Sequence, residues 1–271
     1  MSATRSPFRF AGVADVGGLT VHPFAGLPEQ IVDQVGHDSA PGVLGLQLYF
    51  NHFLQWEGAQ GTLVDNTVTS GWRAQIVATT GTATITPMTS VDFGAIQISS
   101  PTTINDFALL ELVGAPFFYQ VGKRMWCFAR LQVPSPTLTG VFLGFGAAGL
   151  NADPTQAANH PADGIFLTKL SSAGTNLDLV ARQNTVSTTR ANILGTALTT
   201  TDVTVGFLVD AAGNIIPFEN GTARTASIIA AGDANIPNVA GDRMCPYIAV
   251  STGAAAIRNL NLDWVLFAQE R

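Results

Sequence analysis

Residues 257–270, IRNLNLDWVLFAQE, alternate between apolar and polar side chains and decide the fold class of this chain. The stretch divides into two sets of side chains, which are Leu260, Leu262, Trp264 and Leu266 on one face and Asn259, Asn261 and Asp263 on the other. A period of two residues is the period of a β-strand with one buried face. We therefore expect an antiparallel strand whose leucine and tryptophan side chains face the core.

The same alternation recurs along the chain. It places two further sets of side chains on buried faces, namely Val203, Val205, Phe207 and Val209, and Leu177, Leu179 and Ala181. The stretches DAAGN (residues 210–214) and ENGT (residues 219–222) have compositions typical of hairpin loops. No stretch after residue 74 keeps a helical period for ten residues. Many strands without helices predict an all-β fold, an antiparallel jelly-roll sandwich.

The first 46 residues differ from this pattern. They scatter Phe8, Phe10 and Phe24 among glycine and proline, without a lasting period of two or of 3.6 residues. Solvated linkers are poor in aromatic residues, so this segment is expected to make contacts. It is either an extended arm that lies against a partner or an irregular segment packed on its own domain. We divide the chain into an N-terminal arm, residues 1–46, and a β-sandwich, residues 47–271.

Composition and charge exclude several function classes. The formal net charge is −6 and the chain has two lysines, so there is no basic face for nucleic acid. No window approaches the roughly 20 apolar residues of a membrane span. The N-terminus lacks the apolar centre of a signal peptide, which argues against secretion by that route. Cys127 and Cys245 are too few for a disulfide framework, and we expect reduced core thiols.

Residues 141–150, VFLGFGAAGL, place Gly144, Gly146 and Gly149 at the G-x-G-x-x-G spacing of a dinucleotide-binding loop. Such a loop needs a helix that begins at the third glycine, because the helix N-terminus holds the pyrophosphate. The chain continues instead with two prolines, Pro154 and Pro161, and residues before proline disfavour a helix. We predict no cofactor and interpret the motif as a strand that leaves its sheet in a glycine-rich turn.

Catalytic signatures are weak throughout the chain. Retaining glycoside hydrolysis needs two carboxyl groups about 5 Å apart. No two of the 19 acidic residues are separated by two positions, the spacing that would provide such a pair on one strand. No G-x-S-x-G and no H-E-x-x-H motif occurs. The loop 151–163 collects oxygen donors, but polar loops commonly do, and we assign no metal site. We predict that the chain is not an enzyme and has no catalytic residues.

Four stretches together resemble a known family. They are RMWCFARLQVPSPTLTGVFLGFG (124–146), ADGIFLTKLSSAGTNLDLVAR (162–182), TDVTVGFLVDAAGNIIPFENGTA (201–223) and MCPYIAVSTGAAAIRNLNLDWVLFAQER (244–271). Their order resembles the concanavalin-like jelly-roll proteins encoded among the structural genes of tailed bacteriophages. That family shows an aromatic strand, a strand ending in glycine, a "DG-aromatic" strand, an "NG" hairpin and a last strand with an "L-x-L-D-W" pattern. The resemblance covers roughly residues 47–271.

The resemblance implies a virion structural protein, either a capsid decoration or cement protein, which we favour, or a related fibre or tail component. Its expected partners are the major capsid protein or other virion proteins and further copies of itself, in a virion assembled in the bacterial cytoplasm. We expect Phe8, Phe10 and Phe24 to contact the partner. Enzymes of the wider fold group carry E-x-D-x-x-E on one strand, which this chain lacks. The alternative is a lectin-like, glycan-binding module of a fibre or tail that uses an exposed tryptophan, Trp56 or Trp72.

Overall fold

The structure is a computed structural model of the chain. It describes residues 46–51, 61–69, 71–88, 95–113, 117–150, 152–172, 174–195, 197–238 and 243–270, and for residues 46–51 and Thr69 it describes the backbone alone. In this part of the chain the structure is built from β-strands and two short 3-10 helices, η1 (Ala157–Asn159) and η2 (Thr225–Ser227). The predicted all-β class is confirmed.

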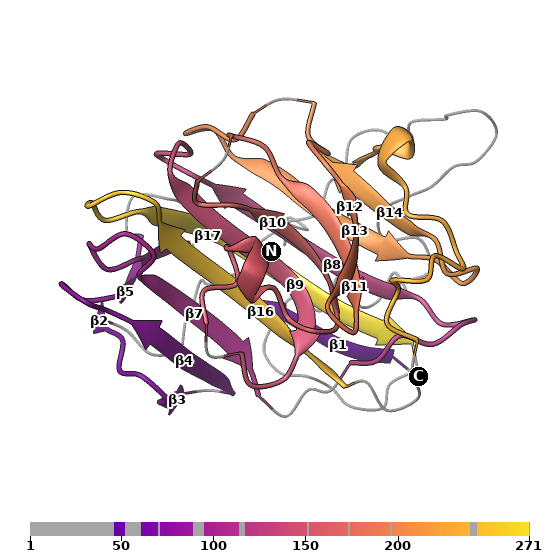
Figure 1. The fold of residues 1–271 in the computed structure, drawn as a ribbon, viewed down its shortest axis with the longest axis horizontal. Coiled ribbons are helices and arrows are strands. Elements are labelled where there is room, and N and C mark those ends of the chain that lie inside the picture. The colour runs from indigo at the N-terminus through magenta and orange to yellow at the C-terminus, as the bar shows by residue number, and fades with distance from the viewer. Residues whose placement is uncertain are drawn as a thin grey trace, which may run out of the picture.

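Two antiparallel sheets lie one over the other (Figure 1). The nine-stranded sheet has the order β15-β14-β13-β8-β17-β6-β5-β2, with β1 also paired to β17. Its strands are β1 (Leu46–Asn51), β2 (Gly61–Thr62), β5 (Thr84–Pro87), β6 (Ile96–Ser99), β8 (Met125–Gln132), β13 (Val203–Val209), β14 (Ile215–Glu219), β15 (Thr222–Ala223) and β17 (Asn259–Glu270).

The eight-stranded sheet has the order β12-β11-β10-β9-β16-β7-β4-β3. Its strands are β3 (Val68–Thr69), β4 (Trp72–Val77), β7 (Phe107–Leu112), β9 (Thr139–Ala147), β10 (Gly164–Lys169), β11 (Asp178–Gln183), β12 (Val186–Arg190) and β16 (Met244–Thr252). Neighbouring strands are often distant in sequence, as when β16 pairs with both β7 and β9. The order therefore follows from tertiary contacts rather than from hairpins alone.

An apolar core fills the space between the sheets. Phe145 of β9 has its ring centroid 4.9 Å from that of Phe117, 6.1 Å from that of Phe207 and 5.6 Å from that of Phe267. Phe207 and Phe267 belong to the nine-stranded sheet, so these contacts join the two layers. An aromatic pair at such separations contributes about 1 kcal/mol beyond the area that it buries.

The last strand, β17, contains a β-bulge. Its register against β8 shifts between Leu262 and Trp264, so Asp263 is an extra residue in the strand. A bulge opposes two residues of one strand to one residue of its partner. The alternation of faces along β17 is therefore interrupted at Asp263.

Because of the bulge, the predicted faces of this strand are correct before Asp263 and wrong after it. Leu260 faces the core between the sheets, as predicted, but beyond the bulge the core-facing residues are Val265 and Phe267. Trp264 and Leu266 instead belong to a second apolar cluster, on the outer face of the sheet. The prediction that they share the core face of Leu260 is wrong, because one inserted residue reverses the faces of everything that follows.

The other two predicted faces are confirmed. The core contains Leu177, Leu179, Ala181, Val205, Phe207 and Val209, and Val203 packs against it. Both predicted hairpin loops are present. In the second, Asn220 and Gly221 adopt φ values of 48° and 79° between β14 and β15. This pair of positive φ values is the reason for an Asn-Gly sequence at the turn.

The two cysteines are confirmed as free, buried thiols. Among the described residues, no helix has the length and apolar character to cross a membrane. The first described strand, β1, pairs with the C-terminal half of β17, from Leu46 opposite Glu270 to Asn51 opposite Val265. The division into an arm, residues 1–46, and a sandwich stays a prediction.

Candidate functional site

The outer face of the eight-stranded sheet is apolar along its central strands. Alternation in β9 directs Val141, Leu143 and Phe145 to the core, so Phe142 and Gly144 face outward. Phe142 stacks on Phe166 of β10, with ring centroids 4.6 Å apart. These side chains belong to a buried cluster with members from β7, β9, β10, β11 and β16. A buried cluster on an outer face must have a cover.

The segment that follows β9 supplies this cover. We call residues 148–163 the covering segment; Asn151 within it lies outside the described residues. Its chain, with η1, crosses the strands of the eight-stranded sheet (Figure 1). The His160 ring lies 5.0 Å from the Phe166 ring, and Arg182 Nη1 of β11 donates to the Ala157 carbonyl at 3.3 Å. The Thr155 hydroxyl bonds the Ser251 hydroxyl of β16.

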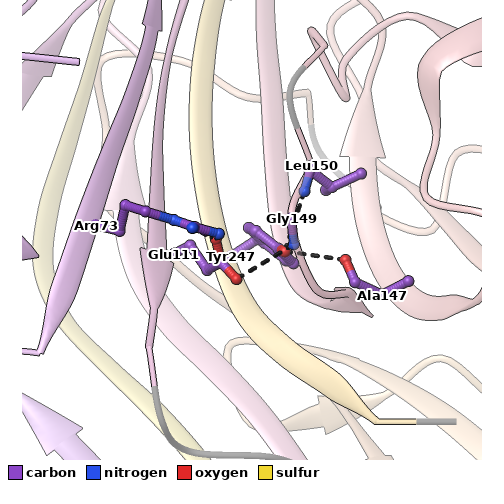
Figure 2. A network of polar contacts seen from close by, with 6 residues as sticks. All are labelled: Arg73, Glu111, Ala147, Gly149, Leu150 and Tyr247. Atoms are coloured by element: carbon purple, nitrogen blue, oxygen red, sulfur yellow. Dashed lines mark hydrogen bonds and ion pairs between the residues drawn. The ribbon is translucent and has the colours of Figure 1, made fainter. Parts of the chain in front are cut away.

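A polar network anchors the start of the covering segment. Arg73 of β4 donates from Nε to Glu111 Oε2 of β7 at 2.9 Å and also pairs with it through Nη2. The amide of Gly149 donates to Glu111 Oε1 at 3.4 Å. Figure 2 shows that Glu111 thereby links the neighbouring strands to the covering segment. Glu111 is only 2% exposed, and its ion pair with Arg73 satisfies a carboxylate that would otherwise be costly to bury.

Tyr247 completes this network. Its hydroxyl donates to the Ala147 carbonyl at 2.9 Å and accepts the Leu150 amide at 3.4 Å (Figure 2). Burial, and then the nearby Glu111, raise the pKa of Tyr247 well above its ordinary value. Burial likewise raises the pKa of Cys245 to about 11. Neither group ionises near neutral pH, so neither is a ready nucleophile.

A second polar cluster holds the middle of the covering segment. Asp153 Oδ1 accepts the amide of Thr155 at 2.9 Å and its hydroxyl at 2.8 Å. Burial raises the pKa of Asp153, while these hydrogen bonds oppose the rise. Ser251 is fully buried and its hydroxyl is bonded to Thr155. The arrangement satisfies polar groups beneath the segment and presents none of them to a substrate.

His160 lies at the far end of the covering segment. Burial, and then the charge of Arg182, lower the pKa of His160 to about 4. Among the described residues its Nε2 atom has no hydrogen-bond partner. This half-buried imidazole favours the neutral form, because protonation would place a second cation beside Arg182.

The glycines of the G-x-G-x-x-G motif serve strand packing and a turn. Gly144 and Gly146 lie inside β9, so the prediction that the strand leaves its sheet at these two glycines is wrong. The strand ends at Ala147, and Gly149, with φ +82°, lies in the segment that follows, as predicted. A Cβ on Gly146 would meet Pro161 of the covering segment at 2.9 Å. The described continuation contains one short 3-10 helix and no α-helix that could hold a pyrophosphate. The Pro161 ring at Gly146 and the β10 backbone at Gly144 leave no room for a side chain at either position.

The predicted contact residues fall in different places. Phe8, Phe10, Phe24 and Trp56 lie outside the described residues. Trp72 is only 3% exposed and packs in the core, 6.5 Å from the Phe267 ring. The expectation that Trp72 is exposed is therefore wrong, since its position in β4 alternates inward.

Sequence reasoning missed the site itself. Arg73 and Glu111 pair across adjacent strands, β4 and β7, which lie far apart in sequence. The available signal was a pair of glycines that face outward on β9, because a Cβ on Gly140 would meet Thr155 and a Cβ on Gly146 would meet Pro161, both of the covering segment. Among the described residues, no group of acidic, histidine and cysteine side chains could hold a metal ion.

No protein-family model and no curated protein matches the chain. Among solved structures it is similar to an endo-1,3-beta-glucanase from Streptomyces sioyaensis, with a TM-score of 0.54 and 13% identity over 85% of this chain and 99% of that chain. A protein of unknown function from Shewanella oneidensis MR-1 has a TM-score of 0.52 and 14% identity over 84% and 88%. Peanut lectin has a TM-score of 0.51 and 9% identity over 83% and 97%. At such identities the likeness shows the fold alone, the concanavalin-like jelly-roll sandwich.

Proposed function

We propose that this chain is a non-enzymatic structural protein of a virion, a decoration protein that binds a capsid lattice. One observation carries the non-enzymatic part: the outer face of the eight-stranded sheet is filled by the chain's own residues 148–163. The face holds a single acidic side chain within the network of Figure 2, Glu111, and that carboxylate is paired with Arg73. Two free carboxyl groups, as glycoside hydrolysis requires, are not brought together there.

The virion part rests on the family resemblance of residues 47–271. A rigid sandwich suits a protein that is added to a lattice, because many copies of a weak contact bind together through avidity. Partner contacts through Phe8, Phe10 and Phe24 stay a prediction. Each buried apolar contact of this kind contributes about 25 cal/mol per Å², offset by the entropy of ordering the arm.

The second candidate is a glycan-binding module, which the fold likeness to peanut lectin supports. With Trp72 in the core, Trp56 is the remaining tryptophan proposed for this role. A glycan would stack on an exposed ring and hydrogen-bond to neighbouring polar groups. Loss of binding on Trp56→Ala, with folding unchanged, is the expected signature.

Addition of the purified protein to particles that lack it tests the main proposal. We expect saturable binding at a fixed number of copies per capsid protein, measured by gel densitometry, and a higher temperature of genome release. A glycan array on the same preparation tests the second candidate. Sub-millimolar glycan binding without particle binding would replace the decoration proposal by the lectin-like one. A turnover screen on polysaccharides tests the non-enzymatic part, and specific hydrolysis would overturn it.

A further inference from the structure

The outer face of the nine-stranded sheet carries a large apolar cluster, which we call the outer patch. It consists of Trp126, Phe128, Leu208, Ile216, Phe218, Trp264, Leu266 and Ala268. These residues alternate with core residues of β8, β13, β14 and β17, so they face away from the other sheet. Their exposed fractions are nevertheless only 0–8%. A face with no second sheet over it is buried, and something must cover it.

Among the described residues, few apolar side chains pack over the outer patch. They are Ala223, the last residue of β15, and Ile228, the residue after η2, and both are half-buried. The patch spans four adjacent strands, about 15 Å at the usual strand spacing. Two side chains at one edge are too few to provide apolar contacts over that width.

Trp126 gives independent evidence for a covering chain. It is fully buried in the outer patch, and its Nε1 atom has no hydrogen-bond partner within the described part of the chain. A buried indole N–H usually has an acceptor. A polypeptide crossing the patch would bring backbone carbonyls to this donor, which an apolar surface of another kind would not.

We infer that residues 1–45 of the same chain cover the outer patch, with Phe8, Phe10 and Phe24 as their apolar contacts. The described chain begins at the rim of the patch. Leu46 is opposite Glu270, two residues from Ala268 on β17, and Ala268 is opposite Trp126 on β8. About five extended residues span 15 Å, so 45 residues are more than enough.

The outer patch and residues 1–45 have complementary side chains. The patch is built from aromatic and aliphatic side chains with no charged member. The segment provides three phenylalanines, whose rings would pack edge to face on the tryptophan and phenylalanine rings of the patch. The inference rests on the patch and on the position of Leu46, not on the proposed virion role. For the free protein, the inference therefore favours an N-terminal segment packed on its own domain over an extended arm.

Chemical cross-linking in the full-length protein tests the placement without removing any phenylalanine. Ser6→Cys places a thiol beside Phe8, and Ala223→Cys places one at the edge of the outer patch. The control pair combines Ser6→Cys with Ala158→Cys, which is exposed on the covering segment over the other sheet. The native thiols are buried in both variants. With a short bis-maleimide, we expect an intramolecular cross-link in the first pair only.

Each other outcome overturns the inference. Equal cross-linking of both pairs would mean that the segment has no fixed place on the nine-stranded sheet. A cross-link that appears only between two chains would assign the cover to a second copy.

Tryptophan quenching provides a second measurement on the full chain. Two of the four tryptophans lie in the outer patch, so F8S/F10S/F24S should raise acrylamide quenching about two-fold. The matched variant F53S/L54S removes apolar side chains from the segment after β1 and should leave quenching unchanged. The reverse result, with quenching raised by F53S/L54S alone, would assign the cover to residues 52–60 and overturn the inference.

Discussion

At the scale of single residues, the glycines of the G-x-G-x-x-G motif serve the fold in two different ways. Gly144 has φ +153°, and a Cβ there would lie 2.5 Å from Phe166 Cα and 2.6 Å from Ile165 O of β10. Gly149 has φ +82° but open space around it. The first glycine is required by a neighbouring backbone, whereas the second is favoured by its turn conformation.

Gly144→Ala should therefore destabilise the fold far more than Gly149→Ala. The methyl group added at Gly144 would meet backbone atoms of β10, which cannot move without breaking a strand pairing. We expect a loss of about 3 kcal/mol from overpacking and strain, against about 1 kcal/mol for Gly149→Ala. Urea unfolding curves measure both values. Equal losses would show that β10 does not approach Gly144 closely.

The ion pairs of this protein differ in how deeply their side chains are buried. The Glu111 side chain is 3% exposed, whereas Arg130 and Asp202 are each 44% exposed at the surface of the nine-stranded sheet. Glu111→Gln should lower the free energy of unfolding by about 2 kcal/mol, because Arg73 and the Gly149 amide lose a charged acceptor. Arg130→Gln should cost about 0.5 kcal/mol. Denaturant titration of both variants tests the contrast, and a neutral Glu111→Gln would contradict it.

At the scale of elements, β17 and the covering segment depart from regular structure. The alternation of apolar residues along β17 shifts by one residue at Asp263. Because Asp263 forms a bulge, the strand still places apolar residues on the core face on both sides of it. The covering segment has little regular structure and is held by hydrogen bonds and ring contacts to the sheet beneath it. Both elements depend on neighbours distant in sequence.

Deletion of Asp263 should be tolerated. With this residue removed, Leu262 would pair opposite Leu131 and Trp264 opposite Arg130 as consecutive residues, and both faces of β17 would be kept. The expected cost is about 1 kcal/mol, from the lost ion pair of Asp263 with Arg130. Deletion of Leu266 instead would turn Phe267 out of the core and should abolish folding. Circular dichroism and thermal unfolding distinguish the two, and failure of both deletions would show that the bulge itself is required.

The covering segment should loosen as the pH falls. The pKa of His160 is lowered to about 4, below its ordinary value of 6.5, so folding favours the neutral imidazole. The stabilisation of the folded state by the neutral His160 is complete above pH 6.5. It is lost as the pH falls from 6.5 towards 4, and the free energy of unfolding falls by at most about 1.4 kcal/mol per pH unit.

His160→Leu should lack this part of the pH dependence. Asp153 is retained in both proteins, so its own titration cancels in the difference between the two unfolding free energies. Urea unfolding at a series of pH values measures that difference. A constant difference from pH 7 to pH 4 would mean that His160 is not protonated on unfolding, contrary to the prediction.

At the scale of the whole molecule, each sheet of the sandwich carries a buried apolar cluster on its outer face. Residues 148–163 cover one face, and the outer patch on the other is buried as well. Under the proposed function, contacts with the lattice would be made by the edges, the loops and the N-terminal segment. Binding to a lattice of proteins needs only such contacts.

Removal of residues 1–45 should leave a folded sandwich that no longer joins particles. All described strands begin at or after Leu46, so cooperative unfolding and the β-sheet circular dichroism should be kept. The exposed outer patch should bind more of an apolar dye such as anilinonaphthalene sulfonate. Co-sedimentation with particles measures incorporation, with the full-length protein as the control. Unchanged incorporation would remove the role proposed for Phe8, Phe10 and Phe24.

Local patterns in the sequence determined the all-β class, the Asn220-Gly221 hairpin and the buried faces of β11 and β13, because alternation and turn geometry depend on consecutive residues. They also argued against a phosphate loop, since the required helix cannot form after Gly149. Only the tertiary structure decided the bulge at Asp263, the burial of Trp72 and the cover over the eight-stranded sheet. The physical reason is that these features depend on which strands are neighbours. Arg73 meets Glu111, and Thr155 meets Ser251, only after distant parts of the chain have paired.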